Sequence, residues 1–341
     1  MAPLVLLTGA TGLIGFRVLR ELLKGDYCVR ITVRAEEKAK TVFSNPMIER
    51  LSPGDRLTST IVTDITAEDA FDQALQDSTY VIHTGSPVPV PGYDPLYQIW
   101  KPTVDGTANL LGAALNFPSI KRVIITSSIV ANMAPMPDPS VMATAASRIQ
   151  LPGIPETFSD VFQAYVLGKI TELNRTDLFM EKNKPHFSLA HVFPGYVLGR
   201  DELVLDAETA LSKGSSCGIL LRSVCGIDSP FPLHGGYVHI DDLAQVFIKV
   251  LELQPTPETP RSFGASTNVD YSVTWDLVEK AFPQAVTDGI FTRAKMLTLP
   301  ISYDSSETEK ALSINFRPYE DAVKDVAQFY LDRLQEKTDT A

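Results

Sequence analysis

A tyrosine and a lysine stand four residues apart in the segment Tyr165-Val-Leu-Gly-Lys169. Residues at this spacing share one face of a helix, so the phenol and the ammonium can lie close together. A free phenol has a pKa of about 10, too high for proton transfer at neutral pH, and a nearby ammonium favours the phenolate. Tyr165 is therefore a candidate general acid. Lys169 is a candidate to tune the pKa of that phenol.

A serine is the third candidate catalytic residue. The run from Arg122 to Ser128, RVIITSS, is rich in β-branched residues and predicts a buried strand. Ligands bind at the carboxyl ends of strands in parallel α/β sheets, where the Ser128 hydroxyl can donate to an oxygen that gains negative charge. Ser127 is the alternative. Side chains alternate along a strand, so the two serines face opposite sides and cannot share the role.

These residues need a scaffold, and the N-terminus indicates which one. The apolar run from Leu4 to Leu7 predicts a strand, and an amphipathic run follows a turn with glycines at every third position. Such a turn lets the backbone approach a ligand, and the helix N-terminus that follows it attracts phosphate. The pattern predicts a dinucleotide site. The expected contacts in the turn are Gly9, Thr11, Gly12, Leu13, Ile14 and Gly15.

The second expected strand, Val29 to Val33, ends at Arg34, and Lys38 follows four residues later. The end of this strand lies beside the adenosine ribose, where NAD sites place an acidic residue. A basic residue there suits a 2′-phosphate instead. We therefore expect NADP(H) as the cofactor. The alternative is that Arg34 is only a solvated surface residue beside Glu36 and Glu37.

Further strands are expected at 57–62, 80–84, 122–128 and 187–192, with helices at 66–77 and 105–116 between them. This alternation predicts a doubly wound parallel sheet, a Rossmann fold. We assign residues 1–195 to an NADP-binding domain, to which 237–256 return through a helix at 241–253. Residues 196–236 and 257–341 form a smaller C-terminal α/β substrate-binding or lid region, with a short strand at 262–265 and a closing helix at 319–336.

The composition of the chain argues against several classes of binding partner. The chain has 341 residues, 44% of them hydrophobic, and a formal net charge of −11. That charge argues against nucleic acid or an anionic membrane as a partner. The three cysteines show no metal-ligand or disulfide spacing. We expect a cytoplasmic monomer or homodimer that binds a small molecule and no metal, with no membrane span.

The motifs together resemble the extended short-chain dehydrogenase/reductase family, and within it the group of dihydroflavonol 4-reductase, cinnamoyl-CoA reductase and yeast methylglyoxal reductase. The matching segments are TGATGLIG (8–15), Arg34 with Lys38, DI (64–65), HTGSP (83–87), PTVDGT (102–107), ITSS (125–128), YVLGK (165–169), PGYVLG (194–199) and VHIDDLA (238–244). The resemblance implies Ser128, Tyr165 and Lys169 as the catalytic residues.

The resemblance also implies further cofactor contacts. They are Asp64 and Ile65 at the adenine, Thr84, Gly85 and Ser86 near the ribose and diphosphate, Thr126, and Pro194 to Val197 at the nicotinamide. The family often has Asn where this chain has Asp105, which we expect to cap a helix. Residues 129–155 match no family pattern, and we expect them to border the substrate.

The expected activity is NADPH-dependent reduction of a ketone or aldehyde to the alcohol. The candidate pocket is mostly apolar and favours a hydrophobic carbonyl compound; it comprises Ser86, Val88, Ile129, Asn132, Phe162 and Tyr196. One alternative is an NAD-dependent sugar-nucleotide epimerase or dehydratase, which needs cations for a diphosphate. The other is a non-catalytic NADP-sensing regulator, a class that usually loses the Tyr-Lys pair.

Overall fold

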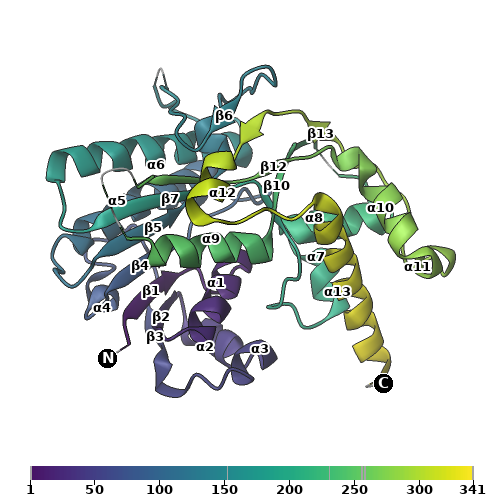
Figure 1. The fold of residues 1–341 in the computed structure, drawn as a ribbon, viewed down its shortest axis with the longest axis horizontal. Helices are drawn as coiled ribbons and strands as arrows, with labels where there is room; N and C mark the ends of the chain where they lie inside the picture. Colours follow the sequence, from purple (N-terminus) through teal and green to yellow (C-terminus); the bar gives the residue numbers. More distant parts are fainter. Residues whose placement is uncertain (1, 152, 230, 255, 257–258, 340–341) are drawn as a thin grey trace.

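A computed structural model describes residues 2–151, 153–229, 231–254, 256 and 259–339. Within those residues one large parallel sheet has seven strands in the order β11-β7-β5-β4-β1-β2-β3 (Figure 1). Its strands are β1 (Leu4–Thr8), β2 (Cys28–Val33), β3 (Leu57–Ile61), β4 (Tyr80–His83), β5 (Arg122–Thr126), β7 (Ser188–Pro194) and β11 (Ser262–Ala265). The order reverses between β1 and β4, as in a Rossmann sheet, which confirms the predicted fold.

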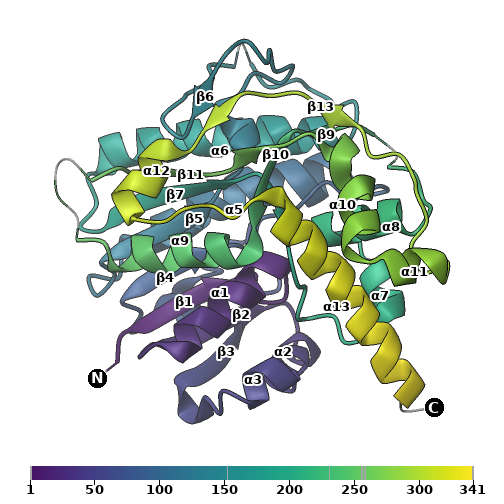
Figure 2. The same cartoon turned by 45° about the vertical axis from the view of Figure 1, so that its right-hand side comes forward.

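Alternation along the strands explains the layers. Val5 and Leu7 of β1 belong to an apolar core with α1 (Leu13–Lys24) and α9 (Ile240–Glu252). Leu6 points to the other face and belongs to a core with α5 (Lys101–Ala114). The long helix α6 (Val161–Asn183) packs beside α5. The sheet is thus buried between two helical layers, with α9 and α1 on one side (Figure 2).

A smaller unit stands beside the carboxyl ends of the large sheet. Its elements are β8 (Tyr196–Leu198), β10 (Gly236–His239), β12 (Thr267–Asn268), α7 (Ala207–Ser212), α8 (Ser216–Val224), α10 (Thr274–Ala281), α11 (Pro283–Thr287) and α13 (Tyr319–Asp339). Tyr237 and Tyr271 each meet the Tyr319 ring edge-on, with centroids 5.1 and 5.5 Å apart. Helix α13 contacts α7, α8 and α10 and encloses this second core (Figure 1).

Shorter elements connect these units. They are α2 (Glu36–Phe43), α3 (Pro46–Glu49), α4 (Asp72–Leu75), α12 (Ser306–Leu312), the pairs β6 (Ala143–Thr144) with β14 (Tyr303–Asp304) and β9 (Leu233–His234) with β13 (Thr298–Leu299), the π-helix η2 (Pro95–Trp100), and the 3₁₀ turns η1 (Gly54–Arg56), η3 (Ile129–Asn132) and η4 (Tyr271–Val273). Among the residues that the structure describes, no helix is long and apolar enough to cross a bilayer.

Two expected helices differ from the structure. The acidic stretch 66–77 forms only the short helix α4, because Asp69 and Asp77 adopt the left-handed region with φ of 58° and 60°. The helix expected from residue 105 begins earlier, at Lys101. Asp105 therefore lies inside it rather than capping it, and the Asp105 carboxylate pairs with Arg175 at 3.5 Å. Residues 262–265, grouped by sequence with the substrate-binding region, form the edge strand of the large sheet.

Candidate active site

Helix α6 carries two of the three candidate catalytic residues towards the end of β5. It begins after Asp160, whose carboxylate accepts a hydrogen bond from the Gln163 N–H at 2.8 Å and so caps the helix. One turn after Tyr165, the Lys169 ammonium donates to the carbonyl oxygen of Thr126, the last residue of β5, at 2.9 Å. The structure thus brings Lys169 to the strand end that Ser128 follows.

Tyr165 lies half-buried on this face of α6. It packs with Phe162 against the apolar cluster that contains Val130, and no other described residue makes a hydrogen bond with its hydroxyl. The phenol of Tyr196 is close enough to interact with Tyr165 electrostatically. Burial, and secondarily Tyr165, raise the pKa of Tyr196 far above its ordinary value. Burial therefore keeps Tyr196 a neutral phenol, and Tyr165 is the candidate whose hydroxyl has no hydrogen-bond partner among the described residues.

The two serines at the end of β5 have different surroundings. Ser128 caps the turn η3, its hydroxyl oxygen accepting from the Val130 N–H at 3.4 Å. An oxygen that accepts still has its own proton to donate, so Ser128 can donate to a substrate oxygen. The Ser127 hydroxyl is buried and has no hydrogen-bond partner among the described residues.

A buried ion pair adds a residue that sequence reasoning missed. The Lys169 ammonium also donates to Glu172 Oε2 at 2.9 Å, and Glu172 Oε1 accepts from the Thr107 hydroxyl at 2.6 Å. Both charged side chains are almost fully buried, with 2% and 0% exposed. The spacing of Glu172, three residues after Lys169 on one helix, is the signal that could have identified the pair.

The glycine turn has the backbone geometry that a diphosphate requires. Gly9 has φ of +75°, and a Cβ there would lie 2.7 Å from the backbone nitrogen of Gly85. A Cβ on Gly15 would collide with the carbonyl oxygen of Gly9. Gly12 is the N-cap of α1 and provides no capping side chain, and the first turn of the helix contains no acidic residue. The α1 N-terminus therefore keeps its amide donors and positive dipole for an anion.

Below the turn, Thr8 joins the ends of β1 and β4. The Thr8 hydroxyl accepts from the Gly85 N–H at 3.0 Å, and its carbonyl oxygen accepts from the Thr84 hydroxyl at 2.7 Å. His83 Nδ1 lies 2.8 Å from the Thr8 hydroxyl. Burial, with a smaller effect of Lys169, lowers the pKa of His83 to about 3, so this imidazole is neutral. The Thr84 hydroxyl therefore donates its hydrogen bond within the protein. The backbone of Thr84 and Gly85 lies beside Gly9 of the turn.

The carboxyl ends of β2 and β3 lie on the same side of the sheet as the turn, and the residues that follow them present charged groups to solvent. Arg34 and Lys38 are exposed, and neither forms an ion pair with any described residue. The Asp64 carboxylate accepts from the backbone and hydroxyl of Thr66 at 2.8 and 2.7 Å. These bonds, with a smaller effect of Arg34, lower the pKa of Asp64. Two free cations near the adenosine end fit a 2′-phosphate.

The remaining residues that we expect to contact the cofactor have the following surroundings. Ile65 packs against α5, where a Cβ on Gly106 would lie 2.6 Å from Ile65 Cδ1. Ser86 Oγ lies 3.4 Å from the Thr103 hydroxyl. The Thr126 hydroxyl is buried and has no partner among the described residues. Pro194 and Val197 lie on β7 and β8, beside the ends of the parallel strands.

The predicted pocket residues are not equivalent. Asn132 is 2% exposed, and its amide makes three hydrogen bonds: Nδ2 donates to the carbonyls of Ala145 and Ser147 at 3.3 and 3.0 Å, and Oδ1 accepts from Tyr303 at 2.9 Å. These bonds anchor the segment after η3. Ile129 is buried against Gly236, and Val88 is 53% exposed.

His234 is a second residue that sequence reasoning missed. Its imidazole stacks on Phe162 with ring centroids 5.7 Å apart. Burial lowers its pKa, so the ring is neutral. No described residue makes a hydrogen bond with it. No local pattern could have revealed this contact, because β9 and α6 are far apart in the sequence.

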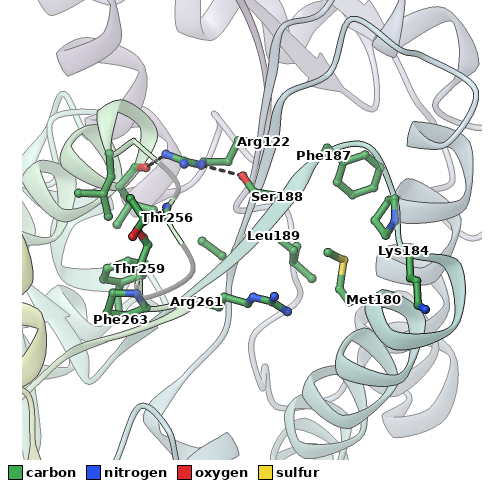
Figure 3. Close-up of a pocket in the computed structure, with 15 residues that line it drawn as sticks. Arg122, Met180, Lys184, Phe187, Ser188, Leu189, Thr256, Thr259, Arg261 and Phe263 are labelled. Atoms are coloured by element: carbon green, nitrogen blue, oxygen red, sulfur yellow. Dashed lines mark hydrogen bonds between the residues drawn. The ribbon is translucent and has the colours of Figure 1, made fainter.

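A separate hollow of about 350 Å³ lies at the opposite, amino-terminal edge of the sheet (Figure 3). There the Arg122 guanidinium donates to Ser188 Oγ at 3.0 Å and to the carbonyls of Val250 and Leu251 at the end of α9. Arg122 begins β5 and Ser188 begins β7, whereas Ser128 follows the end of β5. The hollow is therefore distinct from the candidate active site.

The sequence is similar to those of known reductases over nearly its whole length. Ketoreductase CTB6 of Cercospora nicotianae is 34% identical over 345 residues, which cover 96% of this chain and 95% of the relative. The chain belongs to the extended short-chain dehydrogenase/reductase family. The sequence model of the 3-beta hydroxysteroid dehydrogenase/isomerase family matches residues 6–142 of the chain.

Two further proteins are similar to nearly the whole chain. The NAD-dependent epimerase/dehydratase ALT6 of Alternaria alternata is 31% identical and covers 91% of this chain and 92% of its own. The crystal structure of yeast methylglyoxal/isovaleraldehyde reductase Gre2 complexed with NADPH has a TM-score of 0.80 and 25% identity, and covers 97% of this chain and 99% of its own.

Proposed function

We propose that this chain reduces a ketone or aldehyde on a hydrophobic small molecule to the alcohol, with NADPH as the reductant. It is an oxidoreductase that acts on carbonyl and alcohol groups. The free, half-buried hydroxyl of Tyr165, one turn from the buried Lys169 ammonium, is the observation that carries this proposal. A positioned phenol beside a cation is suited to proton transfer.

Each residue has a role that follows from its surroundings. NADPH, when bound, supplies the hydride. Tyr165 donates its proton to the carbonyl oxygen of the substrate. Ser128 donates a hydrogen bond to the same oxygen as negative charge develops. Lys169 favours the ionised product form of Tyr165 and holds the ribose hydroxyls.

Binding is divided along the edge of the sheet. The α1 N-terminus and the backbone of the glycine turn hold the diphosphate. Arg34 and Lys38 select the 2′-phosphate, and Asp64 with Ile65 borders the adenine. The substrate lies against the partly buried rings of Phe162 and Tyr196, under the C-terminal region that we assign to 196–236 and 257–341. This lining is mostly apolar, which favours a hydrophobic carbonyl compound.

NADPH absorbance followed with a panel of hydrophobic ketones and aldehydes tests the proposal. We expect turnover with NADPH, little with NADH, and turnover from Tyr165→Phe that is about 10²- to 10⁴-fold lower. Nucleotide sugars incubated with NAD⁺ are the comparison, because an epimerase or dehydratase converts them without net oxidation. Conversion of the sugars alone supports the epimerase alternative. NADPH binding without any turnover supports the regulator.

A further inference from the structure

The Lys169 ammonium uses most of its hydrogen-bonding capacity inside the protein. It donates to the Thr126 carbonyl oxygen and to Glu172 Oε2, both at 2.9 Å. An ammonium has three N–H donors, so one remains. Tyr165 lies one helical turn before Lys169 on the same face of α6, so the remaining donor is the one available to Tyr165 and the cofactor ribose.

Glu172 provides the charge that makes this arrangement stable. A buried ammonium without a counter-charge is costly, and Glu172 is the one carboxylate within 4 Å of it among the described residues. The histidines that interact with Lys169 from neighbouring strands do not compensate its charge, since the pKa values of His83 and His191 are lowered to about 3. The carboxylate is itself fixed from α5 by the Thr107 hydroxyl at 2.6 Å.

We propose that Glu172 is a positioning residue for carbonyl reduction. Its carboxylate is the counter-charge of the Lys169 ammonium and directs the free N–H of that ammonium towards Tyr165 and the ribose, and Thr107 holds Glu172 in place. The inference rests on the proposed function, because Lys169 has this task only in that reaction. A lysine has a flexible four-carbon stem, so the Thr126 carbonyl alone leaves its ammonium poorly oriented.

A double-mutant cycle tests whether Glu172 acts through Lys169. Glu172→Gln, Lys169→Met and the combined variant are compared by kcat, by NADPH affinity from a fluorescence titration, and by melting temperature without cofactor. We expect Glu172→Gln to lower kcat about 10-fold or more in the wild-type background and less than about twofold in the Lys169→Met background. The melting-temperature losses should be less than additive, because the combined variant has no unpaired buried charge.

Glu181→Gln is the matched control, because Glu181 lies on the same helix and is exposed. It should match the wild type in kcat and melting temperature. If Glu172→Gln does not fold, Thr107→Val replaces it in the cycle. That variant removes one hydrogen bond to Glu172 and should lower kcat about 2- to 10-fold, again only when Lys169 is present.

An equal fall in kcat in both backgrounds, or a wild-type kcat in Glu172→Gln, overturns the proposal. A wild-type protein that reduces no hydrophobic carbonyl with NADPH overturns the proposed function instead. In that case only the melting temperatures test whether Glu172 and Lys169 stabilise each other. Additive losses in melting temperature would show that they do not.

Discussion

Phe162 stacks on His234 with ring centroids 5.7 Å apart and ring planes inclined by 20°. Phe162 lies one turn before Tyr165, and His234 lies on β9 in the C-terminal half of the chain. The contact therefore joins the helix that carries the candidate acid to the region that we expect to cover the substrate.

We expect Phe162→Ala to redistribute activity towards bulkier ketones while NADPH affinity stays within about twofold, since the cavity it opens is on the substrate side. The measurements are kcat/KM over a ketone series and the NADPH dissociation constant. Leu178→Ala is the control, because Leu178 is on the same helix and 63% exposed. An unchanged preference would place the substrate elsewhere, for example along residues 200–229.

Tyr165→Phe should fold, bind NADPH normally and lose about 10²- to 10⁴-fold in kcat, because it keeps the ring and deletes only the proton donor. Lys169→Ala should differ by weakening NADPH as well, because we propose that its ammonium interacts with both the phenol and the ribose. Stopped-flow reduction rates and fluorescence titrations separate these effects. Near-normal turnover by Tyr165→Phe would mean that another group donates the proton.

Arg34→Asp should weaken NADPH about 10- to 100-fold and leave NADH nearly unchanged, because it replaces a cation beside the 2′-phosphate with an anion. Dissociation constants for both cofactors provide the check. Arg50→Asp changes the net charge equally at an exposed position at the end of α3 and should affect neither cofactor. The assignment of Arg34 to the 2′-phosphate fails if the two cofactors weaken equally.

Much of the fold could be predicted because it depends on local patterns. The strand β1 and the turn through Gly15 follow from apolar alternation and glycine spacing, and α9 from its apolar stripe. Asp105 could not be placed, because a π-helix precedes α5 and moves the start of the helix. The hydrogen bond between Tyr303 and the Asn132 amide could not be predicted, because only the tertiary fold brings these two distant residues together.

The acid sensitivity of the fold should come partly from two buried histidines. Burial, with neighbouring cations, lowers the pKa of both His83 and His191 to about 3. In the unfolded chain they take up protons below a pH of about 6.5, and in the folded chain they do not until a pH of about 3. The free energy of unfolding therefore falls as pH falls through this window, by at most about 1.4 kcal/mol per histidine and pH unit.

Urea unfolding at pH 7.5 and at pH 5.0 measures how much the free energy of unfolding falls between these two conditions. We expect His191→Gln to lose less stability between the two conditions than the wild type, because it has one fewer imidazole to protonate on unfolding. His186→Gln, at an exposed position, should behave like the wild type. Equal losses in all three proteins would assign the acid sensitivity to carboxylates instead.

Helix α9 covers α1, and β11 completes the sheet beside β7, although both come after residue 239. During synthesis on the ribosome, the strands and helices of the first 195 residues emerge without these two neighbours. The face of α1 that packs on α9 then has no partner, and β7 remains an unpaired edge. These two surfaces thus stay uncovered until residue 265 has left the exit tunnel, and we expect a fragment released before that point to aggregate more readily than the whole chain.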